Sequence, residues 1–157
     1  MNHEPANGTY PMKGKFEPLI LAFCCNYCPS CSADLAGSLK MQYPSNIRIV
    51  KVPCIGTIGA IHILKALENG ADGVCLVGCS EGKCEYSSGN YRARKRVQYV
   101  KNLLGKLSIE KERLEIYNIS AGEARKFCEV AREVTETVRS LGPIPLKTKA
   151  ISNSKEE

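Results

Sequence analysis

Cysteine is the residue type in this chain with the greatest capacity for chemistry. The sequence has 157 residues and nine cysteines, and Cys24, Cys25, Cys28 and Cys31 all fall within one short segment. Thiolates bind zinc or iron–sulfur clusters, and paired thiols exchange disulfides. A buried free cysteine is the ordinary alternative, but this density favours a metal or redox site. Because nine is odd, the cysteines cannot all be paired within one chain.

Several cysteines lie where apolar, strand-like runs end. Cys25 closes the run LILAFCC, Cys54 follows IRIVKVP, and Cys79 follows GVCLVG. In an open parallel α/β sheet the carboxyl ends of the strands share one edge, and ligands bind there. Cys28 and Cys84 come shortly after the first and third runs. We therefore expect these cysteines to gather at one edge, with Cys28 close to the other four.

The elements that position these cysteines alternate regularly along the chain. Strand-like runs rich in Val, Ile and Leu cover 18–23, 47–52, 73–78 and 114–119. Continuous apolar character is typical of strands that are covered on both faces of a sheet. A helical pattern follows each run, over 32–43, 58–67, 97–107 and 127–141. This order predicts an α/β fold: one doubly wound, Rossmann- or flavodoxin-like domain, with a four-stranded parallel sheet flanked by helices.

The two ends of the chain differ from this pattern. Residues 1–15 are polar and without period, which predicts a flexible N-terminal tail. The last helix should stop at Gly142 and Pro143, so the domain is expected over 16–142 and a C-terminal arm over 143–157. The N-terminus carries no signal-peptide pattern, and no apolar run approaches the ~20 residues of a spanning helix. These features predict a cytoplasmic protein without a membrane span.

The remaining cysteines and the histidines offer weaker signals. Cys75 lies inside the third strand-like run and Cys128 inside the fourth helical pattern, so both are interpreted as core thiols. Strand alternation points Cys24 opposite to Cys25. His3 lies in the tail and His62 on the exposed side of a helix. The chain has no catalytic-triad, phosphate-loop or dinucleotide-binding pattern, so no nucleotide and no stand-alone substrate site are predicted.

A basic stretch follows Cys84. The chain carries a formal net charge of +6 and only 6% aromatic residues, which argues against nucleic-acid binding. A solvated helix face is the default interpretation of the stretch, and a docking surface beside the cysteines is the alternative. Its basic residues are Arg92, Arg94, Lys95, Arg96, Lys101 and Lys106.

The cysteines and the segments around them resemble a known family, the delta subunit of methyl-viologen-reducing hydrogenase. This is the D-type iron–sulfur subunit of F420-non-reducing hydrogenase. The resemblance covers 23–142 and is carried by CCNYC with ADLAGSLKMQYPSNIRIVKVPCIG, by ILKALENGADGVCLVGCSEGKCEYSSGNYRARKRVQYVKNLL, and by RLEIYNISAGEARKFCEVAREV. The run GADGV, then VGC, then a second cysteine, GNY and a basic helix is quite specific.

The resemblance implies one iron–sulfur cluster, [2Fe–2S] in that family. It also implies electron relay between a hydrogenase or other dehydrogenase and the flavin- and iron–sulfur-containing subunit of a heterodisulfide-reductase-type complex. The family's cysteines correspond here to Cys25, Cys28, Cys54, Cys79 and Cys84, five candidates for four ligand positions. Cys31 departs from the family pattern and is a further candidate, so a [4Fe–4S] cluster is the alternative.

Three functions remain open on the sequence alone. The leading hypothesis is a non-catalytic electron-transfer subunit of an oxidoreductase complex, carrying one iron–sulfur cluster. A structural zinc–thiolate module is the second, because four thiolates suit tetrahedral zinc equally well. The third is a thiol–disulfide oxidoreductase that uses Cys25 and Cys28.

Overall fold

A four-stranded, entirely parallel sheet forms the centre of the molecule. The computed structural model describes residues 15–147. The strands are β1 (Ile20–Cys25), β2 (Ile47–Val52), β3 (Gly73–Gly78) and β4 (Leu114–Asn118), in the spatial order β2-β1-β3-β4. This is the order of flavodoxin-like doubly wound folds, and it reverses between β1 and β3. The predicted α/β class is therefore confirmed.

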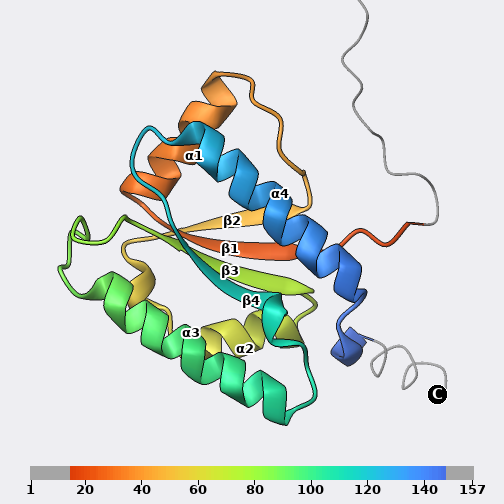
Figure 1. Ribbon diagram of the computed structural model, residues 1–157. Coiled ribbons are helices and arrows are strands. Elements are labelled where there is room, and N and C mark those ends of the chain that lie inside the picture. The colour runs from red at the N-terminus through yellow and green to blue at the C-terminus, as the bar shows by residue number, and fades with distance from the viewer. Residues whose placement is uncertain (1–14, 148–157) are drawn as a thin grey trace, which may run out of the picture.

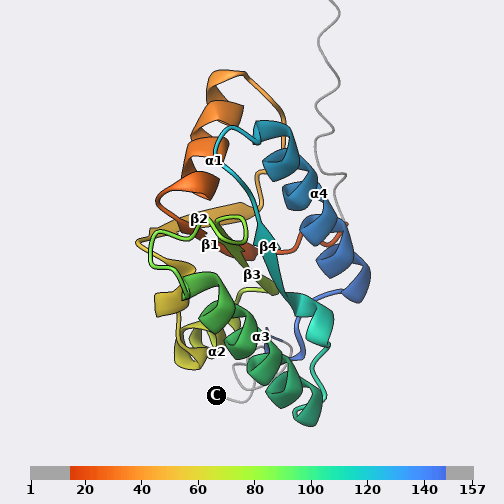
Figure 2. The ribbon, with the colours of Figure 1, turned by 60° about the vertical axis from the view of Figure 1, so that its left-hand side comes forward.

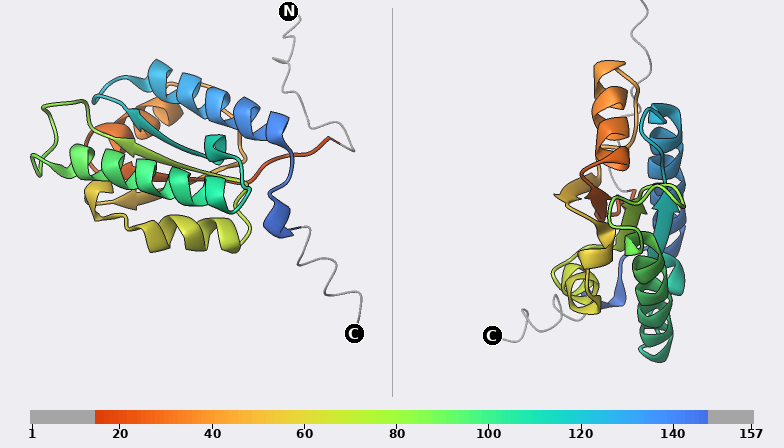
Figure 3. Two further views of the ribbon diagram at one scale, coloured as in Figure 1. Left: turned by 60° about the horizontal axis from the view of Figure 1, so that its bottom comes forward. Right: turned by 90° about the vertical axis from the view of Figure 1, so that its left-hand side faces the viewer.

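Helices cover both faces of the sheet and make three layers. They are α1 (Cys28–Ser38), α2 (Ala60–Glu68), α3 (Gly89–Lys106) and α4 (Ala124–Leu141), with short 3-10 turns η1 (Ile55–Thr57) and η2 (Lys111–Arg113). Helices α1 and α4 lie on one face, and α2 and α3 on the other (Figure 1). The loops that leave the carboxyl ends of the strands are all on the left in Figure 1 and face the viewer in the right-hand view of Figure 3.

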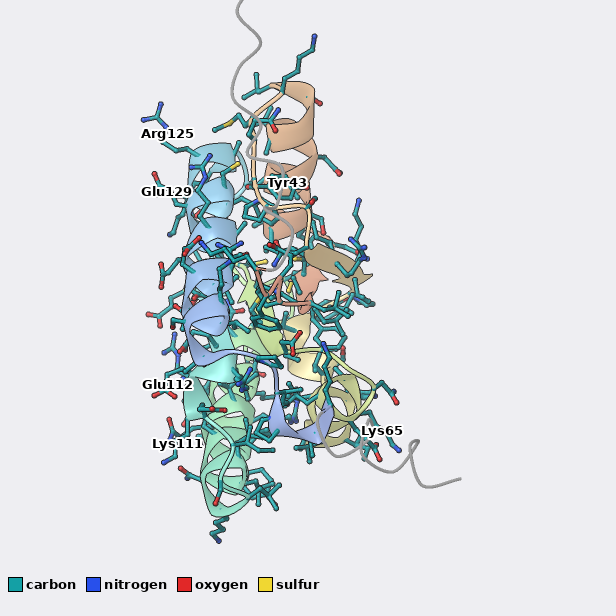
Figure 4. All side chains as sticks on the ribbon, turned by 90° about the vertical axis from the view of Figure 1, so that its right-hand side faces the viewer. Tyr43, Lys65, Lys111, Glu112, Arg125 and Glu129 are labelled. Carbon is teal, nitrogen blue, oxygen red and sulfur yellow. The ribbon has the colours of Figure 1, made fainter. Side chains whose placement is uncertain are left out.

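The sheet separates two apolar cores. One core packs β1 and β3 side chains against α2 and α3, and includes Cys25, Ile63 and Val97. The other lies under α4 and includes Cys24 and Phe127. Cys24 and Cys25 thus point to opposite faces, as strand alternation predicts. Side chains fill the space between the layers, while charged residues of α4 such as Arg125 and Glu129 point outward (Figure 4).

Helix α1 begins earlier than its apolar pattern predicts. The expected start was at Ser32, whereas the helix starts at Cys28 and runs through Pro29 in its first turn. Proline is favoured there because its fixed φ suits the helix. It also lacks an N–H, which costs nothing in the first turn, where an N–H would have no acceptor within the helix. The Ser30 hydroxyl is buried and donates to the Cys25 carbonyl at 2.7 Å. Because polar residues face inward in this first turn, the apolar pattern does not reveal that the helix begins at Cys28.

The packed domain extends beyond its predicted end at Gly142. Ile144 is fully buried, and its N–H donates to the Asp72 carboxylate at 3.1 Å. The Lys147 ammonium reaches the same buried carboxylate at 2.7 Å. Residues 143–147 therefore belong to the packed structure. Residues 148–157, the rest of the predicted arm, and residues 1–14 of the predicted tail lie outside the described residues.

Candidate metal centre

Five thiols come together at the carboxyl edge of the sheet. Cys25 ends β1, Cys28 begins α1, Cys54 and Cys79 follow β2 and β3, and Cys84 lies in the loop before α3. The Sγ atoms of Cys54 and Cys84 are 4.0 Å apart. Negative charge on Cys79 or Cys54 would raise the pKa of Cys25, and negative charge on Cys28 would raise the pKa of Cys79, which places these thiols near one another. The five predicted cysteines thus lie at one edge of the sheet, with Cys54 and Cys84 as a close pair.

Backbone N–H groups point at these sulfurs. The Ile55 N–H donates to the Cys25 Sγ at 3.2 Å, and the Gly56 N–H donates to the Cys54 Sγ at 3.3 Å. The Cys28 N–H, at the start of α1, lowers the pKa of Cys79 and so acts against the effect of burial. These donors lie in η1 and in the first turn of α1, where N–H groups have no partner within the helix. Such a site favours negative charge on sulfur.

Burial and these donors act on the thiols in opposite directions. Burial raises the pKa of Cys25 to about 12 although the Ile55 N–H lowers it, and burial also raises the pKa values of Cys54 and Cys79. Cys84 behaves differently. Burial opposes its ionisation, but the N–H groups of Tyr86, Asn90 and Gly89 lower its pKa below the ordinary range. The Cys84 sulfur thus lies against the N-terminus of α3, a position that favours the thiolate form.

Two glycines allow this approach of sulfur to backbone. A Cβ atom on Gly89 would lie 2.2 Å from the Cys54 Sγ and 2.9 Å from the Cys84 Sγ. A Cβ atom on Gly56 would lie 2.7 Å from the Gly89 Cα. Real Cβ atoms do not come so close to backbone or sulfur, so η1 and the first turn of α3 can meet only through glycine.

Two asparagines support the site and were not predicted. The side-chain amides of Asn90 and Asn118 both donate to the Cys79 carbonyl, at 2.5 and 2.7 Å. They fix the backbone at the end of β3 from α3 and from β4. The GN pair that opens α3 lies in the stretch that resembles the hydrogenase subunit, which is the only sequence signal for Asn90.

The other predicted positions lie apart from this group. Cys31 is exposed on α1, and no short sulfur contact among residues 15–147 involves it. Cys75 and Cys128 are buried in the cores, as their surroundings predict. His62 is exposed on α2, and its ring accepts a hydrogen bond from the Gly59 N–H. His3 lies outside the described residues.

The surface around the thiols is aromatic and partly hollow. The rings of Tyr27 and Tyr86 meet edge to face, with centroids 6.5 Å apart, and both side chains are exposed. A cavity of about 240 Å³ opens beside Cys54 and is lined in part by Tyr86 and Arg92. Cys54 therefore lies against a recess at the surface, while Cys25 is enclosed.

Most basic residues of α3 are exposed, in line with the solvated face that was the default interpretation, but Arg96 and Lys101 are half-buried. Arg94 pairs with Glu81, and Lys101 pairs with Glu115 at 2.7 Å. The half-buried Arg96 turns toward η1. Arg92, Arg94, Lys95 and Lys106 are exposed, and the Lys95 ammonium lies 4.5 Å from the centre of the Tyr91 ring. Leu107, the last residue of the predicted helical pattern, lies just beyond the end of α3 at Lys106 and is 64% exposed.

The donor set fits a thiolate-bound metal. Two thiolates on one tetrahedral metal, at about 2.3 Å each, lie ~3.8 Å apart, close to the observed Cys54–Cys84 separation of 4.0 Å. The described residues contain no group of three or more His, Cys, Asp or Glu side chains already arranged around one point. The five sulfurs have the chemistry for a metal centre, and the Cys54–Cys84 pair has a separation that suits one.

Fold and site together define a class: a small, doubly wound α/β domain with a thiol cluster at its sheet switch point. The family described as "Methyl-viologen-reducing hydrogenase, delta subunit" matches residues 20–142. The chain belongs to this family. None of the helices within residues 15–147 combines the length and apolar character needed to cross a membrane.

Individual relatives agree with the family match. The D-type iron–sulfur subunit of the vhu F420-non-reducing hydrogenase of Methanopyrus kandleri is 47% identical over 128 residues, covering 82% of this chain and 97% of that protein. Its counterpart in Methanocaldococcus jannaschii is 44% identical over 131 residues, covering 83% and 98%. The A-type subunit of the ferredoxin/F420H2-dependent CoB-CoM heterodisulfide reductase of Methanosarcina acetivorans is 36% identical over 127 residues, 81% of this chain but 16% of that protein.

Proposed function

We propose that this protein is an electron-transfer subunit that carries one [2Fe–2S] cluster at the carboxyl edge of its sheet. The observation that carries this proposal is the close pair of Cys54 and Cys84 sulfurs, with Cys25, Cys28 and Cys79 at the same edge of the sheet and backbone N–H groups that donate to the Cys25 and Cys54 sulfurs. Thiolate ligands and hydrogen bonds to sulfur are the features by which proteins hold such clusters and set their potentials.

Cys54 and Cys84 hold one iron in this proposal, because their sulfurs already have nearly the required separation. Two of the remaining three thiols, Cys25, Cys28 and Cys79, hold the other iron. Cys31 is no ligand, since it points to solvent from α1. A bound cluster supplies one-electron transfer. The N–H groups of Ile55 and Gly56 stabilise the added negative charge, and the buried backbone around Cys25 excludes water.

The partners are proposed from the relatives. Proteins named as hydrogenase iron–sulfur subunits align with this chain over almost their whole length. A homologous stretch forms part of the longer A-type chain of a heterodisulfide reductase. We therefore infer that this subunit works in the cytoplasm, between a hydrogenase or another dehydrogenase and the flavin-containing subunit of a heterodisulfide-reductase-type complex. It relays electrons and has no substrate site of its own.

Anaerobic purification of the full chain tests the proposal. We expect a brown protein with two irons and two acid-labile sulfides per chain, and an electron paramagnetic resonance signal after one-electron reduction. A colourless protein with one zinc would support the structural zinc module instead. A colourless, metal-free protein whose Cys25 and Cys28 cycle with glutathione would support the thiol–disulfide oxidoreductase.

A further inference from the structure

We infer that Arg96 is a positioning residue that holds the η1 turn against α3, and so fixes the N–H donors that point at the Cys25 and Cys54 sulfurs. Its Nη1 atom donates to the carbonyl oxygens of Gly56 at 2.9 Å and of Ile58 at 2.5 Å. The effect on reduction potential rests on the proposed cluster, whereas the effect on the turn does not.

One face of α3 is built to contact this turn. Gly89, Ala93 and Arg96 follow one another at helical spacing and therefore lie on the same side of the helix. A side chain on Gly56 would collide with the Gly89 backbone, a side chain on Gly89 would collide with the Cys54 and Cys84 sulfurs, and Ala93 is fully buried. Arg96 completes the face about two turns from Gly89. The turn and the first turns of α3 lie side by side in Figures 1 and 2.

The same short turn presents the donors to sulfur. Its Ile55 N–H reaches Cys25 and its Gly56 N–H reaches Cys54. The turn closes on itself through the Thr57 hydroxyl and N–H, which both donate to the Cys54 carbonyl, at 2.7 and 3.0 Å. These local bonds shape the turn, and the buried Ile55 side chain and the Ile55 bond to Cys25 join it to the core and to β1. Arg96 adds a polar attachment to α3, with one charged donor on two carbonyls of the turn.

The physical consequence concerns the reduced state of the centre. Hydrogen bonds from N–H groups to sulfur favour added negative charge and raise a cluster's reduction potential. The Gly56 N–H and the Cys54 sulfur belong to the same turn and move together, whereas the Ile55 N–H reaches across to Cys25 at the end of β1. Loss of Arg96 is therefore expected to weaken the bond to the Cys25 sulfur and to shift the Cys54 sulfur with the turn, although Arg96 contacts neither sulfur.

The test compares three variants of the full, anaerobically purified protein. Arg96→Met keeps most of the side-chain stem and removes the donors. Arg96→Lys keeps the charge, and one ammonium can in part replace the single nitrogen that makes both bonds. Lys95→Met removes a positive charge from the same helix at an exposed position that does not touch η1. We expect the reduction potential to shift downward in Arg96→Met, less in Arg96→Lys, and not in Lys95→Met.

Amide hydrogen exchange separates this inference from the proposed function. In Arg96→Met, the peptide containing residues 54–58 should exchange faster than in the wild type, while peptides from β4 and α4 remain unchanged. This readout applies even if the wild-type protein contains no iron, an outcome that would overturn only the proposed cluster. Equal exchange of residues 54–58 in Arg96→Met and Lys95→Met would overturn the positioning role. Equal shifts of the reduction potential in those two variants would also overturn the positioning role. They would mean that Arg96 acts only through its positive charge.

Discussion

Gly56 and Gly89 touch through their backbones, and this contact brings the turn after β2 against the first turn of α3. The Cys54 and Cys84 sulfurs lie beside the contact, 2.2 and 2.9 Å from where a Cβ atom of residue 89 would be. The close approach of the proposed ligand pair therefore requires glycine at position 89, and glycine at position 56 lets the turn pack against it. This relationship gives the first prediction.

We expect Gly89→Ala to disturb the site, because its new methyl group must displace the Cys54 sulfur. Iron per chain should fall well below the wild-type value, and urea unfolding should show a destabilisation of about 1–3 kcal/mol from overpacking. The matched control is Gly37→Ala in α1, where an added Cβ meets nothing within 4 Å. That variant should keep its iron and gain about 0.5–1 kcal/mol in stability, as alanine does over glycine in a helix. Full iron content in Gly89→Ala would contradict the close packing.

Single Cys→Ser variants should identify the ligands. Cys54→Ser and Cys84→Ser are expected to lose the [2Fe–2S] absorption and most of the iron, since they form the proposed pair on one iron. Among Cys25, Cys28 and Cys79, one serine variant should retain the cluster, because four positions are available for five thiols. Cys31→Ser should behave as the wild type. Loss of iron in Cys31→Ser would instead indicate the alternative [4Fe–4S] arrangement.

The two core thiols should not affect the metal. Cys75 and Cys128 are 2% and 0% exposed and lie inside β3 and α4. Cys75→Val and Cys128→Ala are therefore expected to keep the iron content of the wild type, with a loss of stability on the order of 1 kcal/mol from altered packing. Iron and sulfide analysis of the soluble variants checks this. A soluble Cys128→Ala protein without iron would show that the α4 thiol contributes to the site.

The segment after Gly142 should stabilise the domain. Ile144 is fully buried in the core beside α2 and α3, so Ile144→Ala should lower the free energy of unfolding by about 2–5 kcal/mol. Leu146→Ala, at a side chain 37% exposed, serves as the control and should cost less than about 1 kcal/mol. Chemical denaturation measures both. Equal effects would mean that residues 143–147 behave as a surface arm.

The exposed basic residues near the thiols should guide a partner. We expect the double reversal Arg92→Glu with Lys95→Glu to slow association with the flavin-containing partner of the heterodisulfide-reductase type and to change its salt dependence. Arg94 and Arg96 are left intact because one pairs with Glu81 and the other holds η1. Lys106→Glu, at the far end of α3, is the positional control. Stopped-flow measurements across a salt series compare the association rates of the double variant and of Lys106→Glu. Identical rates for these two variants would mean that Arg92 and Lys95 contribute to solubility alone.

The gathering of the thiols could be predicted from the sequence because it follows from topology. Four repeats of strand and helix specify a parallel sheet, and parallel strands bring their carboxyl ends to one edge. Cys25, Cys54 and Cys79 need only lie at strand ends to become neighbours. The opposite orientation of Cys24 and the burial of Cys75 follow equally from local alternation and apolar surroundings. None of these predictions requires knowledge of which side chains meet.

Contacts between distant segments had to come from the tertiary structure. The early start of α1 depends on polar side chains that find partners elsewhere, as Ser30 does at the Cys25 carbonyl. The attachment of residues 143–147 depends on the buried Asp72, far away in sequence.

Arg96 looks in the sequence like any other charge on a basic helix, yet it bonds two carbonyls of a turn that precedes it by about forty residues. Periodicity and composition describe each residue's own element. Which element lies opposite, and at what distance, is decided by packing. Only the packed structure shows that Gly89 and Arg96 contact the η1 turn and do not belong to an ordinary solvated helix face.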